Sequence, residues 1–398
     1  MKDNLYCIPI GPQHPALKEP INFTVTLDGD IIVDADLRLG YNHRGIEKAC
    51  EERNFVQCIY LTERICGICS HSHATNFTLA VEELLNLEVP KRAQYIRMLI
   101  GELERIHSHY LWLGVAAHEA GFDTLFMYTW RDREIVMDML EQISGNRVNY
   151  GINKIGGVRR DIPKEYIPEF LSGLDKLEER TLEYIKVAGS EETFVVRLKN
   201  VGTVPHNEAQ NMCLVGPMGR ACGLPCDVRK IDPYLSYDEV AFDMIVEQDG
   251  DVMAQAKVRL KETIESIKIC RYILQNLPDT PLALEKVPRK VPAGEVVARY
   301  EAPRGEDIHY VKSNGTTNPE RVKVRAPTLA NWLGVLYGLR GAQLADIPLS
   351  GAGIDPCISC TERIGIYRKR KDSIEYIDWD WLREYGIEWY KKHKKVVR

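Results

Sequence analysis

The sequence predicts an α+β fold, in which a central bundle of long helices within one large body is flanked by small β-sheets. Three patterns support this prediction. Residues 21–40 alternate apolar and polar side chains, residues 45–146 repeat apolar side chains at helical spacing, and residues 295–315 return to alternation. No repeat, low-complexity tract or evident linker precedes Cys360, so separable domains are not expected.

The predicted elements follow from these patterns in chain order. Residues 21–40 form a β-hairpin, because an Asp-Gly pair lies between two alternating runs. Residues 45–146 form a helical bundle, in which residues 89–121 are too long and too apolar on one stripe for a lone surface helix. A Gly-rich loop is expected at residues 151–163, a long helix within residues 237–277, strands from residue 295 and a short helix at residues 328–341.

We expect one domain at residues 1–363, made of a hairpin region (1–44), a helical bundle (45–290) and a C-terminal β/α region (291–363). The remaining segment, residues 364–398, differs from this domain in composition. It holds ten Lys and Arg against six Asp and Glu, and three of the six tryptophans. One interpretation is a basic, aromatic segment that docks on a partner or on an anionic membrane surface.

Composition and charge narrow the possible classes of protein. The 398 residues include 44% apolar side chains, which is typical of a globular protein with a buried core. A formal net charge of -5 gives no sign of the basic face that binds nucleic acid, so no nucleic-acid partner is expected. The sequence has no apolar run long enough to span a membrane and no signal peptide, so a cytoplasmic location is expected.

Eleven cysteines in a chain of this kind suggest reduced thiols rather than a disulfide framework. Four of them form two CxxC pairs, Cys66 with Cys69 and Cys357 with Cys360. Two such turns can bring four thiolates onto structural zinc, an iron–sulfur cluster or another thiophilic metal. The pairs are 288 positions apart, from Cys69 to Cys357, and the chain between them encloses a large core that does not need zinc to stabilise it, which favours a redox metal.

The residues around the two pairs also suit redox chemistry. Glu63, Arg64, His71 and His73 flank the first pair, and Asp355 precedes the second. Carboxylate, guanidinium and imidazole groups beside thiolates are typical of a metal that handles protons and electrons.

The motif "RICGICSHSH" together with "DPCISCTER" resembles the two cysteine motifs of the large subunit of nickel–iron hydrogenases. The resemblance runs from about Gly11 to Arg363. Within it, "IPIGPQHPALKEP", "GELERIHSH" and "ISGNRVNYGINKIGGVRRDI" are similar to energy-converting, membrane-associated hydrogenases related to the 49 kDa subunit of respiratory complex I. The resemblance implies the fold of those large subunits.

The resemblance also implies a bimetallic site. Cys66 and Cys357 would bind nickel terminally, whereas Cys69 and Cys360 would bridge nickel to an iron that carries carbon monoxide and two cyanides. Thiolates are soft donors that suit nickel, and ligands drawn from both ends of the chain can hold a metal between packed elements.

Four further residues match functional positions of the family. His73 would hydrogen-bond a bridging sulfur, the guanidinium of Arg304 in "EAPRGE" would lie over the two metals, Asp355 is the acid before the third cysteine, and Glu19 would begin a proton path. From the residues alone, the alternatives are an ion pair of Arg304 with Glu301 or Glu306 on a surface turn and a structural role for His73.

Glu47 occupies the place of a glutamate that helps hold a magnesium ion or a water cluster in many classical relatives. Those enzymes end in a histidine three residues after the last cysteine, where this chain has Arg363. A guanidinium cannot ligate a cation and can itself neutralise Glu47, which argues against magnesium. Some relatives are also cut at this point by a maturation protease after nickel insertion, so cleavage after Arg363 and removal of residues 364–398 is the second interpretation of the tail.

The implied activity is the reversible activation of dihydrogen. The thiolate of Cys357 or Cys66, aided by Arg304, would act as base, with Glu19 as proton relay. Implied partners are a small iron–sulfur subunit, ferredoxin as the ultimate electron carrier, and membrane subunits that couple the reaction to proton or sodium translocation and hold the chain peripherally on the inner face of the membrane. The alternatives are a quinone- or sulfur-linked complex I-like subunit, whose members typically lack part of the cysteine set, and a zinc-stabilised scaffold.

Overall fold

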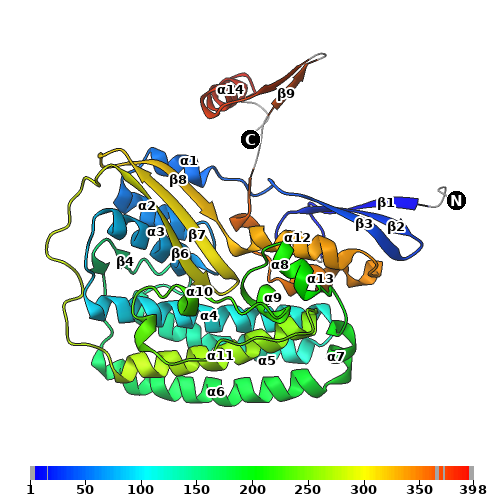
Figure 1. The fold of residues 1–398 in the computed structure, drawn as a ribbon, viewed down its shortest axis with the longest axis horizontal. Coiled ribbons are helices and arrows are strands. Elements are labelled where there is room, and N and C mark those ends of the chain that lie inside the picture. Colours follow the sequence, from blue (N-terminus) through cyan, green and yellow to red (C-terminus); the bar gives the residue numbers. More distant parts are fainter. Residues whose placement is uncertain (1–4, 16, 364–366, 371–372, 394–398) are drawn as a thin grey trace.

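The computed structural model describes residues 5–15, 17–363, 367–370 and 373–393. Long helices lie along one side of the body, and three-stranded sheets with shorter helices lie along the other (Figure 1). The long helices are α4 (Lys91–Glu119), α5 (Asp123–Ser144), α6 (Ile167–Ser190) and α11 (Val252–Gln275). This combination of a helical bundle with small sheets confirms the predicted α+β class.

The first sheet is formed by the N-terminal strands. The strands β1 (Leu5–Ile10), β2 (Asn22–Asp28) and β3 (Ile31–Arg38) pair antiparallel in that order. The pairing of β2 with β3 across Gly29 and Asp30 confirms the predicted hairpin. Strand β1 was not predicted, because its side chains are almost all exposed and therefore show no alternation. Phe23 of β2 packs edge-to-face on Trp332 of α12 (Pro327–Leu339), so this sheet covers the C-terminal helices.

The helical region expected at residues 45–146 is confirmed. It begins with α1 (Ile46–Glu51), α2 (Phe55–Glu63) and α3 (Ser70–Leu84) and continues with α4 and α5. Helix α4 contacts α3, α5 and α11, which explains why nearly all of its 29 residues are buried. The core of the bundle therefore surrounds α4.

The middle of the chain is more irregular than the sequence indicates. The Gly-rich loop forms a minimal hairpin of β4 (Asn153–Lys154) and β5 (Gly157–Val158). Helix α6 follows it within the helical bundle expected at residues 45–290, although no separate helix was predicted at its position. The short helices are α7 (Glu192–Leu198), α8 (His206–Asn211), α9 (Gly216–Ala221) and α10 (Val228–Ile231). The long helix expected within residues 237–277 is α11, which begins at Val252 because the Asp251 carboxylate accepts a hydrogen bond from the Ala254 N–H (2.7 Å) and caps it.

The second sheet is formed by β6 (Gly294–Ala302), β7 (Gly305–Ser313) and β8 (Pro319–Arg325), which pair antiparallel. It confirms the strands expected from residue 295, and α12 confirms the short helix. Helix α3 packs on β6 and β7. The chain then passes through α13 (Ile347–Gly353) to the second cysteine pair.

A buried ion network links α4 to α11 and β6. Its members are Glu102, Arg105, Arg220, Asp227, Arg229, Glu262 and Glu301, none of which is more than 2% exposed. Arg220 Nε lies 2.7 Å from Glu262 Oε1, and Arg220 Nη1 lies 2.9 Å from Glu301 Oε1. Arg229 pairs with Asp227 and Glu102, and Arg105 pairs with Glu102. Each guanidinium therefore has a carboxylate partner inside the protein.

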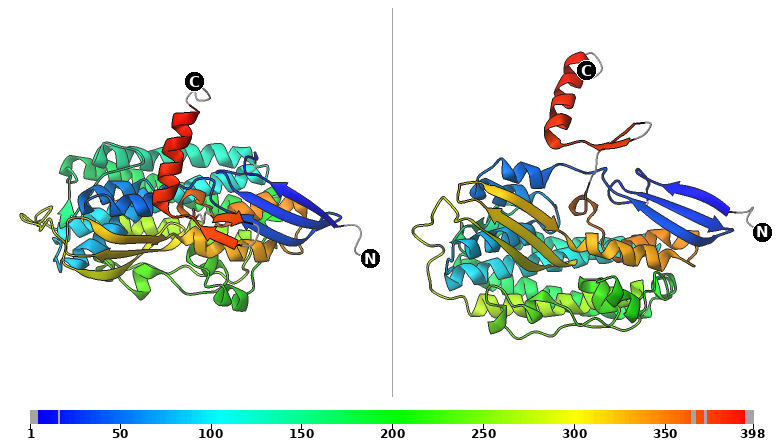
Figure 2. Two further views of the ribbon diagram at one scale, coloured as in Figure 1. Left: turned by 90° about the horizontal axis from the view of Figure 1, so that it is seen from above. Right: turned by 45° about the horizontal axis from the view of Figure 1, so that its top comes forward.

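The C-terminal segment stands away from the body. A hairpin of β9 (Tyr367–Arg370) and β10 (Ser373–Tyr376) leads to α14 (Trp379–Lys392), and the views in Figures 1 and 2 show both projecting outward. Tyr376, Tyr385 and Tyr390 expose at least half of their surface. The peptide bond after Arg363, where cleavage is expected, leads into residues 364–366, which lie outside the described part of the chain. Among the described residues, no helix combines the length and the apolarity needed to cross a membrane.

Candidate metal centre

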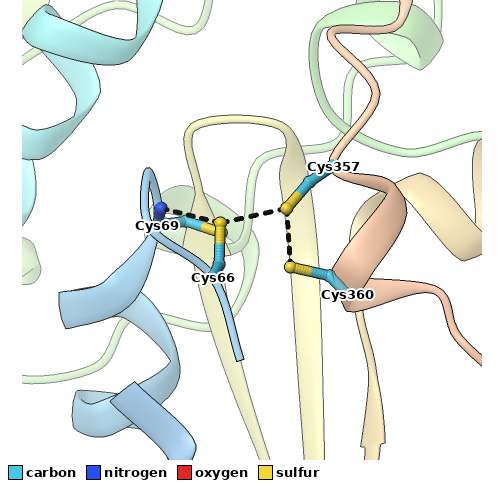
Figure 3. A group of neighbouring side chains, drawn as sticks. All are labelled: Cys66, Cys69, Cys357 and Cys360. Carbon is cyan, nitrogen blue, oxygen red and sulfur yellow. Dashed lines mark hydrogen bonds between the residues drawn. The ribbon is translucent and has the colours of Figure 1, made fainter. Parts of the chain in front are cut away.

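The two CxxC pairs meet inside the body. The sulfur atoms of Cys66, Cys69, Cys357 and Cys360 all lie within 4.8 Å of one another, and each residue is at most 6% exposed (Figure 3). Cys66 Sγ lies 3.0 Å from Cys357 Sγ, which in turn lies 2.7 Å from Cys360 Sγ. The structure thus brings together the four cysteines that the sequence singled out.

The first pair lies between α2 and α3. Cys69 precedes α3, and the backbone N–H groups of Ile68 and Cys69 both donate to Cys66 Sγ (3.2 Å each). Burial opposes charge on this sulfur, but hydrogen bonds with the other three cysteines and the nearby Arg304 lower the pKa of Cys66. The local geometry therefore favours a thiolate.

Helix α4 holds the start of α3 in place. The buried Glu104 carboxylate of α4 accepts hydrogen bonds from the N–H groups of His71 (2.7 Å) and Ser72 (3.0 Å). These donors belong to the first turn of α3 and have no partner within the helix. The contact fixes the helix that carries Cys69 against the central helix of the bundle.

The second pair lies on a short strap after α13. The Cys357 N–H donates to Thr328 Oγ1 (3.2 Å), and the Ser359 N–H donates to Glu19 Oε2 (2.9 Å). Asp355 adopts a φ of 57°, a left-handed conformation that aspartate tolerates better than most residues. Glu19 therefore contacts the backbone between the two cysteines of this pair.

Arg304 lies in the turn between β6 and β7 and reaches the strap. Its Nε donates to the Asp355 carbonyl oxygen (2.6 Å) and its Nη2 to Asp355 Oδ1 (2.8 Å). The turn packs so closely on Gly216 that a Cβ there would lie 2.3 Å from the Arg304 carbonyl oxygen. Burial opposes the charge of Arg304, but Asp355 and the cysteine sulfurs raise its pKa. The buried side chain does not form the surface ion pair that was the alternative.

His73 lies on α3, one turn after Cys69. Its Nδ1 faces Asp307 Oδ2 (3.3 Å) and His309 Nε2 (3.2 Å), both on β7. Its Nε2 is buried and has no hydrogen-bond partner among the described residues, and its bond to a bridging sulfur, which the resemblance implies, stays a prediction. A buried ring nitrogen without a partner beside four thiols is the kind of group that a bound metal centre can satisfy.

Glu47 and Arg363 contact each other at the edge of the site. Glu47 Oε1 accepts a hydrogen bond from the Val324 N–H (2.9 Å) and lies 3.2 Å from Arg363 Nη2. Both residues line a cavity of about 290 Å³ that reaches Cys360. The carboxylate already has a cationic partner, in line with the argument against magnesium.

The donor set fits a nickel–iron group. Four sulfurs and no oxygen ligand surround the centre, and soft thiolates select thiophilic metals. The set is compatible with the implied ligands.

Several residues of the site were not recognised from the sequence. Ser108 donates to the Asp355 carboxylate (3.4 Å), Thr328 holds Cys357, and Asp307 and His309 hold His73. Ser108 and Glu104 lie in the motif "GELERIHSH", which carries the resemblance to the family but does not indicate a role for either residue. Asp307 and His309 alternate along the strand that follows Arg304, and this spacing could have indicated a shared buried face.

Two family models match the chain. The description "Respiratory-chain NADH dehydrogenase, 49 Kd subunit" matches residues 119–289 and 286–363, and "Nickel-dependent hydrogenase" matches residues 44–114. The chain is 43% identical over 359 residues to the carbon monoxide-induced hydrogenase of Rhodospirillum rubrum, covering 90% of this chain and 99% of that protein. It is 42% identical over 379 residues to the membrane-bound hydrogenase subunit alpha of Pyrococcus furiosus, covering 92% of this chain and 89% of the relative.

A solved structure gives the same fold. A chain of the membrane-bound sulfane sulfur reductase, described as an archaeal respiratory membrane complex, aligns with a TM-score of 0.86 and 32% sequence identity. The alignment covers 91% of this chain and 100% of the other. Matches at this level confirm the predicted hydrogenase large-subunit and complex I 49 kDa fold. The chain therefore belongs to the oxidoreductase family that unites the large subunits of membrane-bound, nickel-dependent hydrogenases with the 49 Kd subunit of the respiratory-chain NADH dehydrogenase.

Proposed function

We propose that this chain is the catalytic subunit of an energy-converting hydrogenase, which interconverts dihydrogen with protons and electrons. The observation that carries the proposal is the convergence of both CxxC pairs, with all four sulfurs within 4.8 Å in a buried site. Relatives named as hydrogenases at 42–43% identity support it.

The four cysteines would hold the metals. Nickel would be bound by all four sulfurs, with Cys66 and Cys357 terminal, and Cys69 and Cys360 shared with an iron that carries carbon monoxide and two cyanides. When bound, this group supplies the Lewis acid that polarises dihydrogen and the metal orbitals that accept its electrons.

The surrounding residues would handle the proton. The thiolate of Cys357 or Cys66 takes it, and Arg304, held by Asp355, keeps a positive charge beside those sulfurs in a site that excludes water. Glu19 relays the proton outward, since its carboxylate contacts the backbone next to Cys360. His73 is proposed to hydrogen-bond a bridging sulfur through its partnerless Nε2.

Electrons need a partner protein. In the described part of the chain, the only groups of His, Cys, Asp and Glu with ligand geometry are the four cysteines and the neighbouring cluster of His73, Asp307 and His309. A small iron–sulfur subunit would therefore take the electrons one at a time, with ferredoxin as the ultimate carrier. Membrane subunits would couple the reaction to proton or sodium translocation and hold the chain on the inner face of the membrane. The relatives named as membrane-bound support the association with a membrane complex.

We also propose that a maturation protease removes residues 364–398 after nickel insertion by cutting after Arg363. The separation of this segment from the body in Figures 1 and 2 supports the proposal, because its removal would leave the core unchanged. The intact mass of nickel-loaded protein tests it. A chain that ends at Arg363 is expected, and one that still ends at Arg398 contradicts it.

A second candidate is a complex I-like subunit that reacts with a quinone or with sulfur compounds. The match to the sulfane sulfur reductase favours it. The complete set of four converging cysteines favours the hydrogenase, because a subunit without nickel has no need for them.

Infrared absorption of the purified holoprotein is the most informative test. Bands from metal-bound carbon monoxide and cyanide, with nickel and iron in equal amounts by elemental analysis, are expected. Zinc alone would point to a structural scaffold, and the absence of metal would point to the quinone- or sulfur-linked subunit. Either result would overturn the proposed function.

A further inference from the structure

Beside the metal centre lies a cluster of three buried polar side chains, His73, Asp307 and His309, of which only His73 has a place in the mechanism above. Asp307 Oδ2 lies 3.1 Å from His309 Nε2 and 3.3 Å from His73 Nδ1, and the two ring nitrogens lie 3.2 Å apart. None of the three residues is more than 1% exposed. Polar groups buried this deeply normally have a specific role or a full set of partners.

The cluster connects the two segments that carry the metal-centre residues. His73 lies on α3, and its backbone N–H donates a hydrogen bond to the carbonyl oxygen of Cys69 (3.3 Å), the residue that precedes the helix. Asp307 and His309 are two residues apart on β7 and therefore face the same side of the sheet, on which α3 packs. Strand β7 starts directly after Arg304. The cluster therefore connects α3, which follows Cys69, with β7, which follows Arg304.

The hydrogen bonds identify which ring nitrogen of His73 carries a proton. Asp307 Oδ2 already accepts a hydrogen bond from the Asn76 amide nitrogen (3.0 Å). Burial alone would raise the pKa of Asp307, but His73 and His309 hold it well below its ordinary value, so the group is an ionised acceptor. Because a carboxylate can only accept, His73 Nδ1 (3.3 Å) and His309 Nε2 (3.1 Å) are both assigned as donors to Asp307, and the 3.2 Å contact between these two nitrogens is then not a hydrogen bond. His73 therefore donates from Nδ1.

The same three atoms have the spacing of metal ligands, so a metal ion has to be weighed as well. Two observations oppose it. The Asn76 amide group donates to the oxygen that would have to bind the metal, and the outer nitrogens His73 Nε2 and His309 Nδ1 lack the partners that metal-bound histidines almost always have.

We propose that Asp307 is a positioning residue that anchors the His73 ring through Nδ1 and so presents Nε2 to the metal centre. The inference rests on the proposed function, since it needs a centre for Nε2 to face. Nδ1 is held by Asp307 of β7, and Nε2 is the remaining polar atom of the ring, one turn from Cys69, buried and without a hydrogen-bond partner in the described part of the chain. His309 donates to the same oxygen and keeps the carboxylate in place.

The test uses the holoprotein in its complex and compares Asp307→Asn with Asp132→Asn. Both changes replace a buried carboxylate by an amide, but Asp132 pairs with Tyr184 and Arg131 in the bundle and is not part of the centre. In Asp307→Asn we expect the carbon monoxide and cyanide bands to shift and turnover to fall about 10- to 100-fold, with nickel and iron retained. Asp132→Asn should leave the bands in place. Unchanged bands and turnover in metal-loaded Asp307→Asn would overturn the inference.

If Asp307→Asn does not take up metal, the variant His309→Leu tests the proposal in its place. It leaves the contact between His73 and Asp307 intact and removes one donor, so a smaller shift of the same bands is expected, and unchanged bands would overturn the proposal. A third metal present in stoichiometric amount in the wild type and lost in Asp307→Asn would also overturn it.

Failure of the proposed function can be recognised separately. If the wild type has neither nickel nor the infrared bands, nitrogen-15 NMR of the histidine-labelled full chain still reports the proton position. The signal that disappears in His73→Gln should show a proton on Nδ1. A ring with its proton on Nε2 alone would refute the anchoring by Asp307, with or without metal.

Discussion

The metal centre and the buried ion network are both polar and both lie buried beside α4. They differ in whether their groups are compensated by partners of opposite charge. In the network, the guanidinium of Arg220 has carboxylate partners on α11 and β6, and Arg229 has two more. In the centre, four sulfurs gather within 4.8 Å of one another. Among the described residues, His73 Nε2 has no hydrogen-bond partner, and neither has Arg220 Nη2 of the network. The difference teaches that buried ions can be compensated by opposite charges of the same chain, whereas four sulfurs gathered at one point mark a site for a metal.

The largest effect is expected from Cys357→Ser, which changes the metal centre and leaves the ion network intact. Removing one terminal ligand should abolish nickel retention and hydrogen turnover, because serine is a hard donor that binds nickel poorly. Metal content and gas consumption by the purified complex measure this. Cys270→Ala is the matched control, since Cys270 is a fully buried cysteine in the bundle without a partner of CxxC spacing, and it should retain nickel. Full activity of Cys357→Ser would end the assignment of the centre.

The network should respond in the opposite way. Arg220→Met leaves Glu262 and Glu301 without their shared cation, and breaking a buried pair of this kind costs roughly 3–5 kcal/mol of unfolding free energy. Denaturant unfolding measures the loss. Nickel content per folded molecule should remain that of the wild type. A variant with normal stability and depleted nickel would show that the two regions are not distinct.

The pH dependence of stability sharpens the contrast further. Burial alone would raise the pKa of Glu262, but Arg220 and His109 lower it from its ordinary value of 4.5 to about 2. A carboxyl with a depressed pKa stabilises the fold above pH 4.5, and this stability is lost as the pH falls toward 2. The contribution at neutral pH is about 3 kcal/mol.

Glu262→Gln should therefore be less stable than the wild type at pH 7, and the difference should shrink as the pH falls from 4.5 toward 2. Denaturant titrations at several pH values measure it. A difference that is constant with pH would mean that the Glu262 charge does not contribute.

The smallest effect is expected at the edge of the centre. Glu47 and Arg363 are 24% and 44% exposed at their side chains, and ion pairs of this exposure contribute less than about 1 kcal/mol. Glu47→Gln should therefore change stability little and keep nickel and turnover. Activity that is lost in this variant and depends on added magnesium in the wild type would restore the divalent-ion site that Arg363 argues against.

The sequence predicted the parts of the site that depend on residue type and spacing. Cys66, Cys69, Cys357 and Cys360 could be grouped because thiolates in CxxC turns share one chemistry wherever the chain carries them. Asp307 and His309 could not be connected to His73, because their contact depends on how β7 packs on α3. Glu102, Arg220 and Glu262 were not assigned to the core, because isolated charged residues normally indicate a surface.

The fold likewise has parts that the sequence pattern predicts and parts that it does not predict. The helices around α4 and the hairpin of β2 and β3 follow from periodicity, whereas β1 carries exposed side chains on both faces and gives no pattern to read. Helix α11 begins at Val252 rather than near residue 237, because the cap at Asp251 fixes its start more firmly than the apolar repeat does.

Because the metal centre draws one cysteine pair from each end of the chain, it cannot be assembled during synthesis. A ribosome has to release Cys360 before the fourth sulfur can approach the other three, by which time the helical bundle has already emerged. A product that ends before Cys357 lacks half of the ligands, so the centre forms only on chains that were translated through to its last cysteine.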